Sequence, residues 1–209
     1  MLSNLGIIFS SVAFFVSLTL IYLSFAELKI SNNIISQKIY KISLVQLIFS
    51  ILSFIVLLLG YIFSDFSMIN VFENSHTTKP LFYKISGTWG NHEGSLLLWI
   101  NILVLFSFLF LFLNKNKNRN FKIYTLIFQN LLITGFLIFL LTNSNPFSPI
   151  FPVPNEGMGL NPILQDPALA IHPPLLYVGF VGSSIYFSAA LAALISKIDS
   201  RSLAISIKP

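Results

Sequence analysis

The stretch "ISLVQLIFSILSFIVLLLGYIF", residues 42–63, contains no charged side chain. A helix needs about 20 apolar residues to cross the hydrocarbon core of a bilayer, and this stretch is long enough. Four further stretches meet the same criterion, at residues 5–25, 95–113, 123–141 and 173–196. Because the bilayer offers no water to a backbone, these stretches must be helices. We predict an all-α, polytopic membrane protein with about five transmembrane helices, forming a single integral membrane domain over residues 1–209.

The composition supports this class. Charged residues make up 9% of the chain, against about a quarter in soluble domains, so a water-soluble fold is excluded. The net charge is +5, but the basic residues form no patch with interleaved aromatics, so the expected partner is the lipid bilayer and not nucleic acid. The chain has no cysteine, which excludes disulfides, thiol redox chemistry and cysteine-ligated metals.

The lysines and arginines predict the orientation. Ten basic residues lie in the first link, the third link and the tail, whereas the second link holds only Lys79 and Lys84 and the fourth holds none. By the positive-inside rule the N-terminus faces outside and the C-terminus inside. The N-terminal stretch lacks a basic leader and a cleavage site, so it is expected to stay as a spanning helix. Residues 64–94 and 142–172 then form outer-face loops, which hold His76, His92 and His172.

The fourth stretch is the least regular. Gln129, Asn130, Thr134 and Gly135 interrupt its apolar run. Small and polar residues of this kind favour a helix–helix contact inside the membrane.

The segment "IHPPLLYVGFVG", residues 171–182, contains a histidine directly before two prolines. Pro173 disfavours helical geometry at His172, and proline is accepted in a first helical turn, so we expect His172 near the N-cap of the fifth helix. The helix dipole opposes protonation there, and the neutral imidazole is the form that binds a metal. The free N–H groups of the turn suit an anion such as a propionate.

Beyond His172 the fifth helix offers an apolar wall, with two glycines that permit a close approach; the wall is Leu175, Leu176, Tyr177, Val178 and Phe180, and the glycines are Gly179 and Gly182. An axial histidine, an apolar wall and a place for carboxylates together describe a haem site. The alternative is a histidine that caps the helix or makes a hydrogen bond.

The second segment is "GTWGNHEGSLLLWI", residues 87–100. Trp89 is expected at the membrane interface with its N–H in water, and Gly90 and Gly94 permit a tight entry into the third helix. Glu93 falls in the first turn, where the helix dipole favours a carboxylate.

If that helix begins near Asn91, then His92, Ser95 and Trp99 share one stripe. The stripe has two interpretations. It is either a capped, Trp-anchored helix start or a functional surface, and the functional surface is either a docking surface or one that pairs His92 with His172 across the outer face. His76 has no such context and is interpreted as a solvated loop residue.

The link "NPFSPIFPVPNEGMGLNPILQDPALAIHPP" is long and rich in proline. Proline stiffens the backbone, and long loops of this kind are usually functional or disordered. Because the link also contains Phe147, Phe151, Leu160 and Ile163, we expect a stiff, partly apolar lid on the helix ends.

Two motifs resemble a known family. "WGNHEGSLLLW" (89–99) and "LNPILQDPALAIHPPLLYVGFVG" (160–182) are similar to the N-terminal part of CcmF, the haem lyase subunit of cytochrome c maturation. The resemblance implies that haem b arrives on the outer face from the chaperone CcmE and is joined through its vinyl groups to the CXXCH cysteines of apocytochrome c. It implies that His172 is an axial ligand of the haem iron. We place Pro173 and Pro174 beside the cofactor, with His92 and Trp89 as weaker candidates and no catalytic residue assigned.

The resemblance also implies a missing part. The family has a tryptophan-rich segment, whereas this chain has only Trp89 and Trp99. A partner that carries this segment is therefore expected, and lyase activity is expected only in its company. The missing part is explained either by a natural split subunit or by a truncated sequence. The abundance of Phe, Ile, Asn and Lys favours a split subunit of the mitochondrial inner membrane, with the bacterial inner membrane as the alternative location. A scaffold that docks CcmE or apocytochrome c, and a respiratory-complex subunit without haem, are the competing functions.

Overall fold

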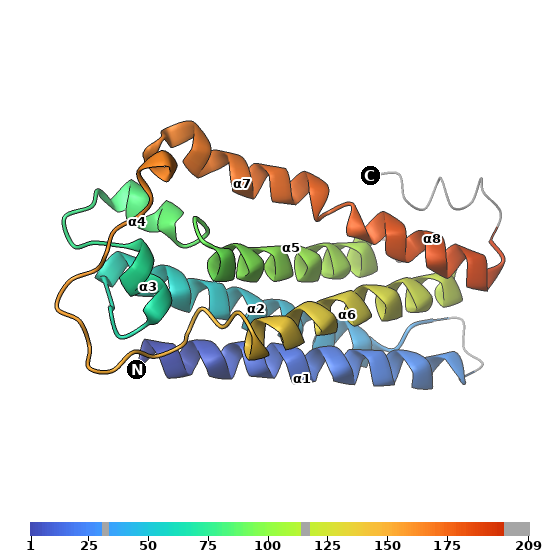
Figure 1. The fold of residues 1–209 in the computed structure, drawn as a ribbon. Coiled ribbons are helices and arrows are strands. Elements are labelled where there is room, and N and C mark those ends of the chain that lie inside the picture. Colours follow the sequence, from blue (N-terminus) through green and yellow to red (C-terminus); the bar gives the residue numbers. More distant parts are fainter. Residues whose placement is uncertain (31–33, 114–117, 199–209) are drawn as a thin grey trace.

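The computed structural model describes residues 1–30, 34–113 and 118–198 (Figure 1). Within these described residues, five helical spans are long and apolar enough to cross a membrane, which confirms the predicted fold class. They are α1 (Leu2–Leu28), α2 (Gln37–Phe63), α5 (His92–Leu113), α6 (Arg119–Thr142) and a fifth span, Pro167–Ser196. Each is a few residues longer than its uncharged run.

The fifth span is broken. It consists of α7 (Pro167–Phe180) and α8 (Ser184–Ser196), which are separated by a turn at residues 181–183. Helix α8 packs on α6, whereas α7 runs past the start of α5 and diverges from the bundle at its outer end (Figure 1). Gly182 lies in this turn. A larger residue does not fit there, because an added Cβ would collide with the ring of Phe106 and the carbonyl of Val178. The predicted close approach at Gly182 is therefore confirmed, while Gly179 faces open space.

Small side chains allow α1 and α2 to pack closely. The buried residues of α1 recur at alternating steps of three and four, and most are small: Ser3, Gly6, Ser10, Ala13, Ser17, Leu20, Ser24 and Glu27. Since lipid tails are as apolar as leucine, close packing and interhelical hydrogen bonds hold such helices together. One of these bonds joins the hydroxyls of Ser10 and Ser53, 2.6 Å apart.

The polar residues of α6 face its neighbours, as their pattern predicted. The amide of Gln46 in α2 donates to Asn130 at 2.9 Å. Thr134 contacts the hydroxyl of Ser17, and Gln129 donates to Ser184 at 3.0 Å. Gly135 is the exception, because it is exposed and nothing lies within 4 Å of an added Cβ.

The two predicted outer loops lie at the same end of the bundle as Met1 (Figure 1). They contain short elements that were not predicted: α3 (Ile69–Asn74), α4 (Leu81–Gly87) and the 3-10 turn Pro162–Gln165. Backbone hydrogen bonds join the loops, including Ile69 N–H to Ser148 O and Ile150 N–H to Ser67 O, both at 2.9 Å. The outer end is thus one structured cap.

The lid prediction is only partly right. Phe147 and Leu160 are buried, and the hydroxyl of Ser3 donates to the Phe147 carbonyl at 2.7 Å. Phe151 and Ile163, however, are 93% and 70% exposed. The link is therefore anchored at Phe147 and Leu160, while Phe151 and Ile163 present apolar side chains outward.

Candidate functional site

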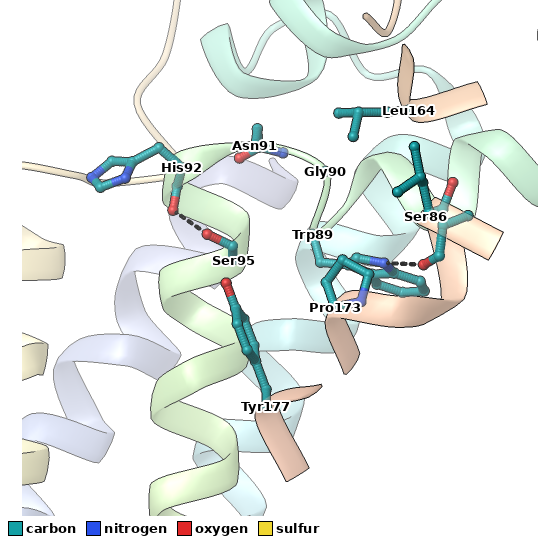
Figure 2. A pocket seen from close by; sticks show the side chains of 11 residues that line it. Ser86, Trp89, Gly90, Asn91, His92, Ser95, Leu164, Pro173 and Tyr177 are labelled. Atoms are coloured by element: carbon teal, nitrogen blue, oxygen red, sulfur yellow. Dashed lines mark hydrogen bonds between the residues drawn. The ribbon is translucent and has the colours of Figure 1, made fainter. Parts of the chain in front are cut away.

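The two sequence motifs meet at the outer end of the bundle. The turn before α5 lies against α7, and residues of both line a pocket of about 230 Å³ (Figure 2). Its walls include Trp89, His92 and Ser95 from the first motif and Ala170, Pro173 and Tyr177 from the second. Residues far apart in the sequence thus form one site, a proximity that neither motif indicates by itself.

A polar network holds the start of α5. The side-chain oxygen of Asn91 accepts from the N–H of Gly94 at 2.7 Å, which caps the helix. The amide of Asn91 donates to the hydroxyl of Tyr61 at 2.9 Å. Asn70 donates both to Asn91 at 2.7 Å and to Glu93 at 3.0 Å. Glu93 does lie in the first turn, as predicted, and it also fixes α3 against α5.

Gly94 is required by space. A Cβ at this position would collide with the backbone carbonyl of Thr88. The predicted tight entry into the helix is confirmed here. Trp89, which follows Thr88, is held at a fixed position relative to α5.

The start of α7 differs from the prediction. The helix begins at Pro167, and its N-cap is Asp166, whose carboxylate accepts from Ala168 N–H at 2.8 Å and Leu169 N–H at 3.1 Å. His172 therefore lies in the second turn, not at the N-cap. Asp166 and Pro167 form a complete start signal of their own, and it outweighs the preference of a residue before proline for extended geometry.

The two prolines lie inside α7, where they cannot donate backbone hydrogen bonds. Pro174 leaves the carbonyl of Ala170 without its helical partner. The indole N–H of Trp89 donates to this carbonyl at 2.8 Å (Figure 2). Trp89 thus replaces the missing backbone donor. The prediction that its N–H lies in water is therefore wrong.

His172 lies away from the pocket. The residues of α7 that line the pocket include Ala170, Pro173 and Tyr177, which are spaced by three and four and share one face of the helix. His172 is exposed, and within the described part of the chain its imidazole has no hydrogen-bond or ion-pair partner.

The helix face around His172 is apolar and open. Leu175 and Leu176 are 67% and 49% exposed. Gly179 lies one turn beyond Leu175, and nothing stands within 4 Å of an added Cβ. The predicted apolar wall therefore splits in two, because Tyr177 turns back toward α5 while the leucines face outward.

Aromatic rings complete the contact between α5 and α7. Trp99 packs edge-on against Tyr177 and Phe180, with ring centroids 5.4 and 5.9 Å apart. The members of the proposed stripe on α5 therefore have different neighbours, since the ring of Trp99 packs against α7 and that of His92 does not.

His92 is turned toward α6. Its Nε2 lies 3.2 Å from the hydroxyl of Ser144, and its ring meets Phe139 edge-on. Figure 2 shows the ring pointing away from Pro173 and Tyr177. Of the interpretations of this stripe, a direct pairing of His92 with His172 is therefore not seen in this structure. No group of three or more His, Cys, Asp or Glu side chains suited to a metal occurs among the described residues.

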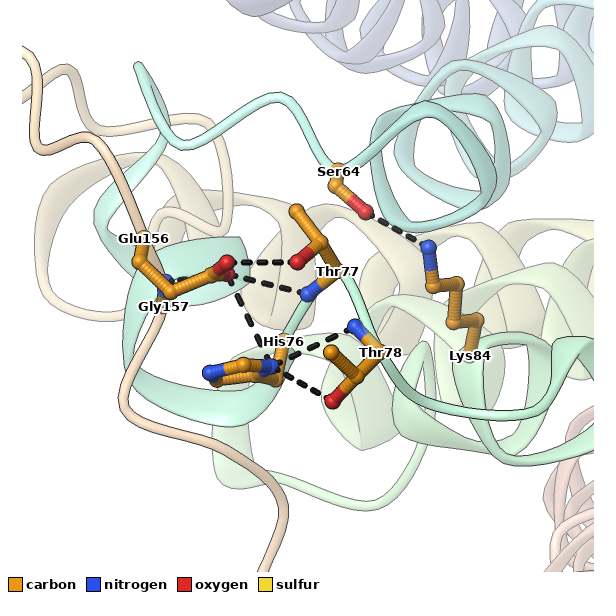
Figure 3. Close-up of polar contacts among 7 residues, drawn as sticks. All are labelled: Ser64, His76, Thr77, Thr78, Lys84, Glu156 and Gly157. Atoms are coloured by element: carbon orange, nitrogen blue, oxygen red, sulfur yellow. Dashed lines mark hydrogen bonds and ion pairs between the residues drawn. The ribbon is translucent and has the colours of Figure 1, made fainter.

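His76 is partly buried and has partners, unlike the freely solvated residue that we expected. Its Nδ1 lies 2.9 Å from the hydroxyl of Thr78 and 3.8 Å from Glu156 of the other outer loop (Figure 3). Glu156 also accepts from the N–H of Thr77 at 2.9 Å and from its hydroxyl. These bonds lower the pKa of the Glu156 carboxyl to about 2. The contact fastens the two outer loops together.

Lys79 follows in the same loop. Its ammonium nitrogen is buried without a hydrogen-bond partner among the described residues. The burial lowers the pKa of Lys79 to about 8.

Comparison with known proteins agrees with this architecture. The sequence pattern of the family described as "Cytochrome C assembly protein" matches residues 89–207, more than half of the chain. The cytochrome c-type biogenesis protein CycK of Rhizobium meliloti is 53% identical over 143 residues, which cover 68% of this chain and 21% of the relative. CcmF of Escherichia coli is 42% identical over 150 residues, covering 71% of this chain and 23% of the relative.

A solved structure titled "Cytochrome c Heme Lyase CcmF" has the same fold over 95% of this chain and 31% of its own length, with a TM-score of 0.76 and 21% identity. The matched region of this chain thus spans about a quarter or less of the length of CycK and of CcmF from Escherichia coli. Its two motifs, its five spans and its sequence matches agree, and the chain belongs to the cytochrome c assembly protein family, as a multi-pass membrane component of the CcmF and CycK type.

Proposed function

We propose that this chain is the haem-presenting N-terminal part of a cytochrome c haem lyase. His172 supplies one axial ligand to haem b on the outer membrane face, where the haem is the substrate to be attached to apocytochrome c. The remaining part of the machine, with its tryptophan-rich segment, covers the other side of the haem. CcmE is the proposed haem donor.

One observation carries this proposal. His172 is an exposed imidazole without a partner among the described residues, and it is fixed on a helix whose opposite face is anchored by Trp89. A structural histidine of this kind usually has a hydrogen-bond partner, as His76 and His92 do. An imidazole without one can offer either ring nitrogen to iron.

The surroundings suit a flat apolar ligand on one side only. Leu175 and Leu176 offer exposed apolar contacts, and Gly179 leaves room for a ring edge. The pocket on the opposite face of α7, about 230 Å³, is smaller than the range of about 300–1,000 Å³ for pockets that enclose organic ligands. The haem is therefore expected to lie on the outward face of α7, enclosed by a second protein surface.

The chemistry left to this chain is binding and orientation. A haem supplies the vinyl groups to which cysteine thiols add. His172 holds the iron at a fixed depth near the membrane surface, and the leucines exclude water from one face of the ring. No residue of this chain is proposed as an acid or base for thioether formation.

Optical spectra of bound haem test the proposal. The chain alone is expected to retain little haem, and its complex with the tryptophan-rich partner is expected to show a six-coordinate low-spin spectrum. His172→Ala should abolish that spectrum and cytochrome c assembly, while His92→Ala should preserve both. An unchanged spectrum in the His172→Ala complex would contradict the ligand assignment.

A scaffold function is the second candidate. It is favoured by the apolar side chains that the outer link exposes, with Phe151, Met158 and Ile163 at 93%, 73% and 70% exposure. In this case Phe151→Ser and Met158→Ser reduce capture of CcmE or apocytochrome c, and His172→Ala leaves haem spectra unchanged. For location, we propose the mitochondrial inner membrane as a split subunit, or the bacterial inner membrane that the relatives imply.

A further inference from the structure

A second cavity lies at the opposite, inner end of the bundle. A groove of about 500 Å³ runs between the first turns of α2 and the last turns of α5. This volume is in the range of sites that hold organic ligands. None of its residues belongs to the motifs described above, so the groove requires a separate explanation.

The deeper wall of the groove is apolar and open to the membrane. Phe108 and Phe112 of α5 stack with ring centroids 5.9 Å apart. Leu44 of α2 lies opposite and is 44% exposed. With a rise of 1.5 Å per residue, Leu44 lies about 10 Å deeper than Gln37 at the mouth. This wall has the length and character to hold part of an acyl chain.

The mouth of the groove is polar. Gln37, Tyr40 and Lys41 line it, and their side chains make no hydrogen bond or ion pair within residues 1–30, 34–113 and 118–198. Tyr40 is partly buried and packs against the core at this end of the bundle. An amide, a hydroxyl and an ammonium group at positions 37, 40 and 41 of α2 are therefore donors without partners among the described residues.

The charge at this end is positive. Lys29, Lys38 and Lys41 lie in or beside the first link, and the carboxylate at this end of the described residues, Glu27, is already bound by Arg119 at 3.4 Å. Basic pockets between helices on the inner side of a membrane bind anionic lipid headgroups. Charge and shape thus select the same kind of ligand.

We propose that this groove binds one anionic glycerophospholipid. Its phosphate contacts Lys41, Tyr40 and Gln37, and an acyl chain lies along Leu44 and the two phenylalanines. The site is independent of haem. It would fix the inner ends of α2 and α5 against each other while the outer end handles its substrate.

Native mass spectrometry of the detergent-solubilised chain tests this proposal, with phosphatidylglycerol and phosphatidylcholine of the same acyl chains. Phosphatidylglycerol is expected to bind more tightly. Lys41→Gln should weaken its binding about fivefold, the effect of one lysine near an anionic membrane surface. Lys38→Gln is the matched control, because Lys38 has the same charge and lies one turn away but does not line the groove. Its expected effect is less than about twofold, because Lys38 lies outside the groove and its charge reaches the headgroup only through water and salt, which screen it.

Further variants and a competitor identify the ligand and control for misfolding of the Lys41→Gln variant. Lys41→Arg should retain binding, and Tyr40→Phe should weaken it without loss of charge. Glycerol 3-phosphate should not compete, which excludes a site for free phosphate. The proposal is overturned if both lysine variants weaken binding equally, if phosphatidylcholine binds as well, or if a photoreactive phosphatidylglycerol labels helices other than α2 and α5. A dimer that closes the groove would also overturn it.

Discussion

Trp89→Phe tests whether one indole N–H anchors the outer half of the fifth span. The substitution keeps an aromatic ring beside α7 but removes the donor that reaches the Ala170 carbonyl at 2.8 Å. Because Pro174 has no N–H, that carbonyl would be left without a donor. A lost hydrogen bond with an orphaned, partly buried partner costs about 1–2 kcal/mol.

Hydrogen–deuterium exchange in lipid nanodiscs measures this cost locally. The amides of Pro167–Phe180 should exchange about 5- to 30-fold faster, which corresponds to about 1–2 kcal/mol of local opening. Trp99→Phe is the matched control. Trp99 also packs against α7, through Tyr177 and Phe180, but no hydrogen bond of its indole is found within the described residues.

A second variant separates the hydrogen bond from ring packing. In the Trp89→Phe background, Pro174→Ala returns a backbone N–H to the Ala170 carbonyl. Exchange should then slow toward the original rate, although α7 remains less firmly attached to α5. If Trp89→Phe accelerates exchange no more than Trp99→Phe, or if Pro174→Ala has no effect in that background, the explanation of the anchor is wrong.

Three more perturbations test other contacts. The pKa of the Glu156 carboxyl is lowered from 4.5 to about 2, so its contribution to loop stability is complete above pH 4.5 and is lost as the pH falls toward 2. Hydrogen–deuterium exchange of the outer loops, measured as a function of pH, tests this. Glu156→Gln should remove this pH dependence of loop stability. Arg119→Gln leaves the buried carboxylate of Glu27 without its ion-pair partner, with only the N–H of Ser36 still donating to it, and should cost about 3 kcal/mol in unfolding experiments. Glu27→Gln should restore part of this loss. Gly94→Ala should lower the thermal midpoint through its backbone collision, whereas Gly135→Ala, in open space, should raise it slightly.

The five spans could be predicted from the sequence because a membrane leaves the backbone few alternatives. The polar contacts of α6 were also predictable, since Gln129, Asn130 and Thr134 would otherwise face lipid. The small residues of α1 carried a similar signal in their three-and-four spacing.

The site was harder to predict, for two physical reasons. Asp166 and Pro167 indicate a helix start at Pro167, whereas Pro173 disfavours helical geometry at His172, so two local signals predict different starts for α7. The bond between Trp89 and Ala170 had no local signal, because it joins residues 81 apart in sequence. The sequence indicates such a bond only indirectly, because two consecutive prolines in a helix leave carbonyls that need donors from elsewhere.

The break at residues 181–183 explains why the two motifs depend on each other. Helix α8 is fixed to α6 by Gln129, which bonds Ser184 and Ser188, but α7 receives little support from the bundle. Its position is set by Trp89 at the Ala170 carbonyl and by Trp99 at the aromatic face. The position of His172 is therefore determined by the first motif, which lies about 80 residues earlier. Under the proposed function, substitutions at Trp89 should displace the haem ligand His172 without changing it. The low-spin haem spectrum should therefore weaken as the amide exchange of α7 becomes faster.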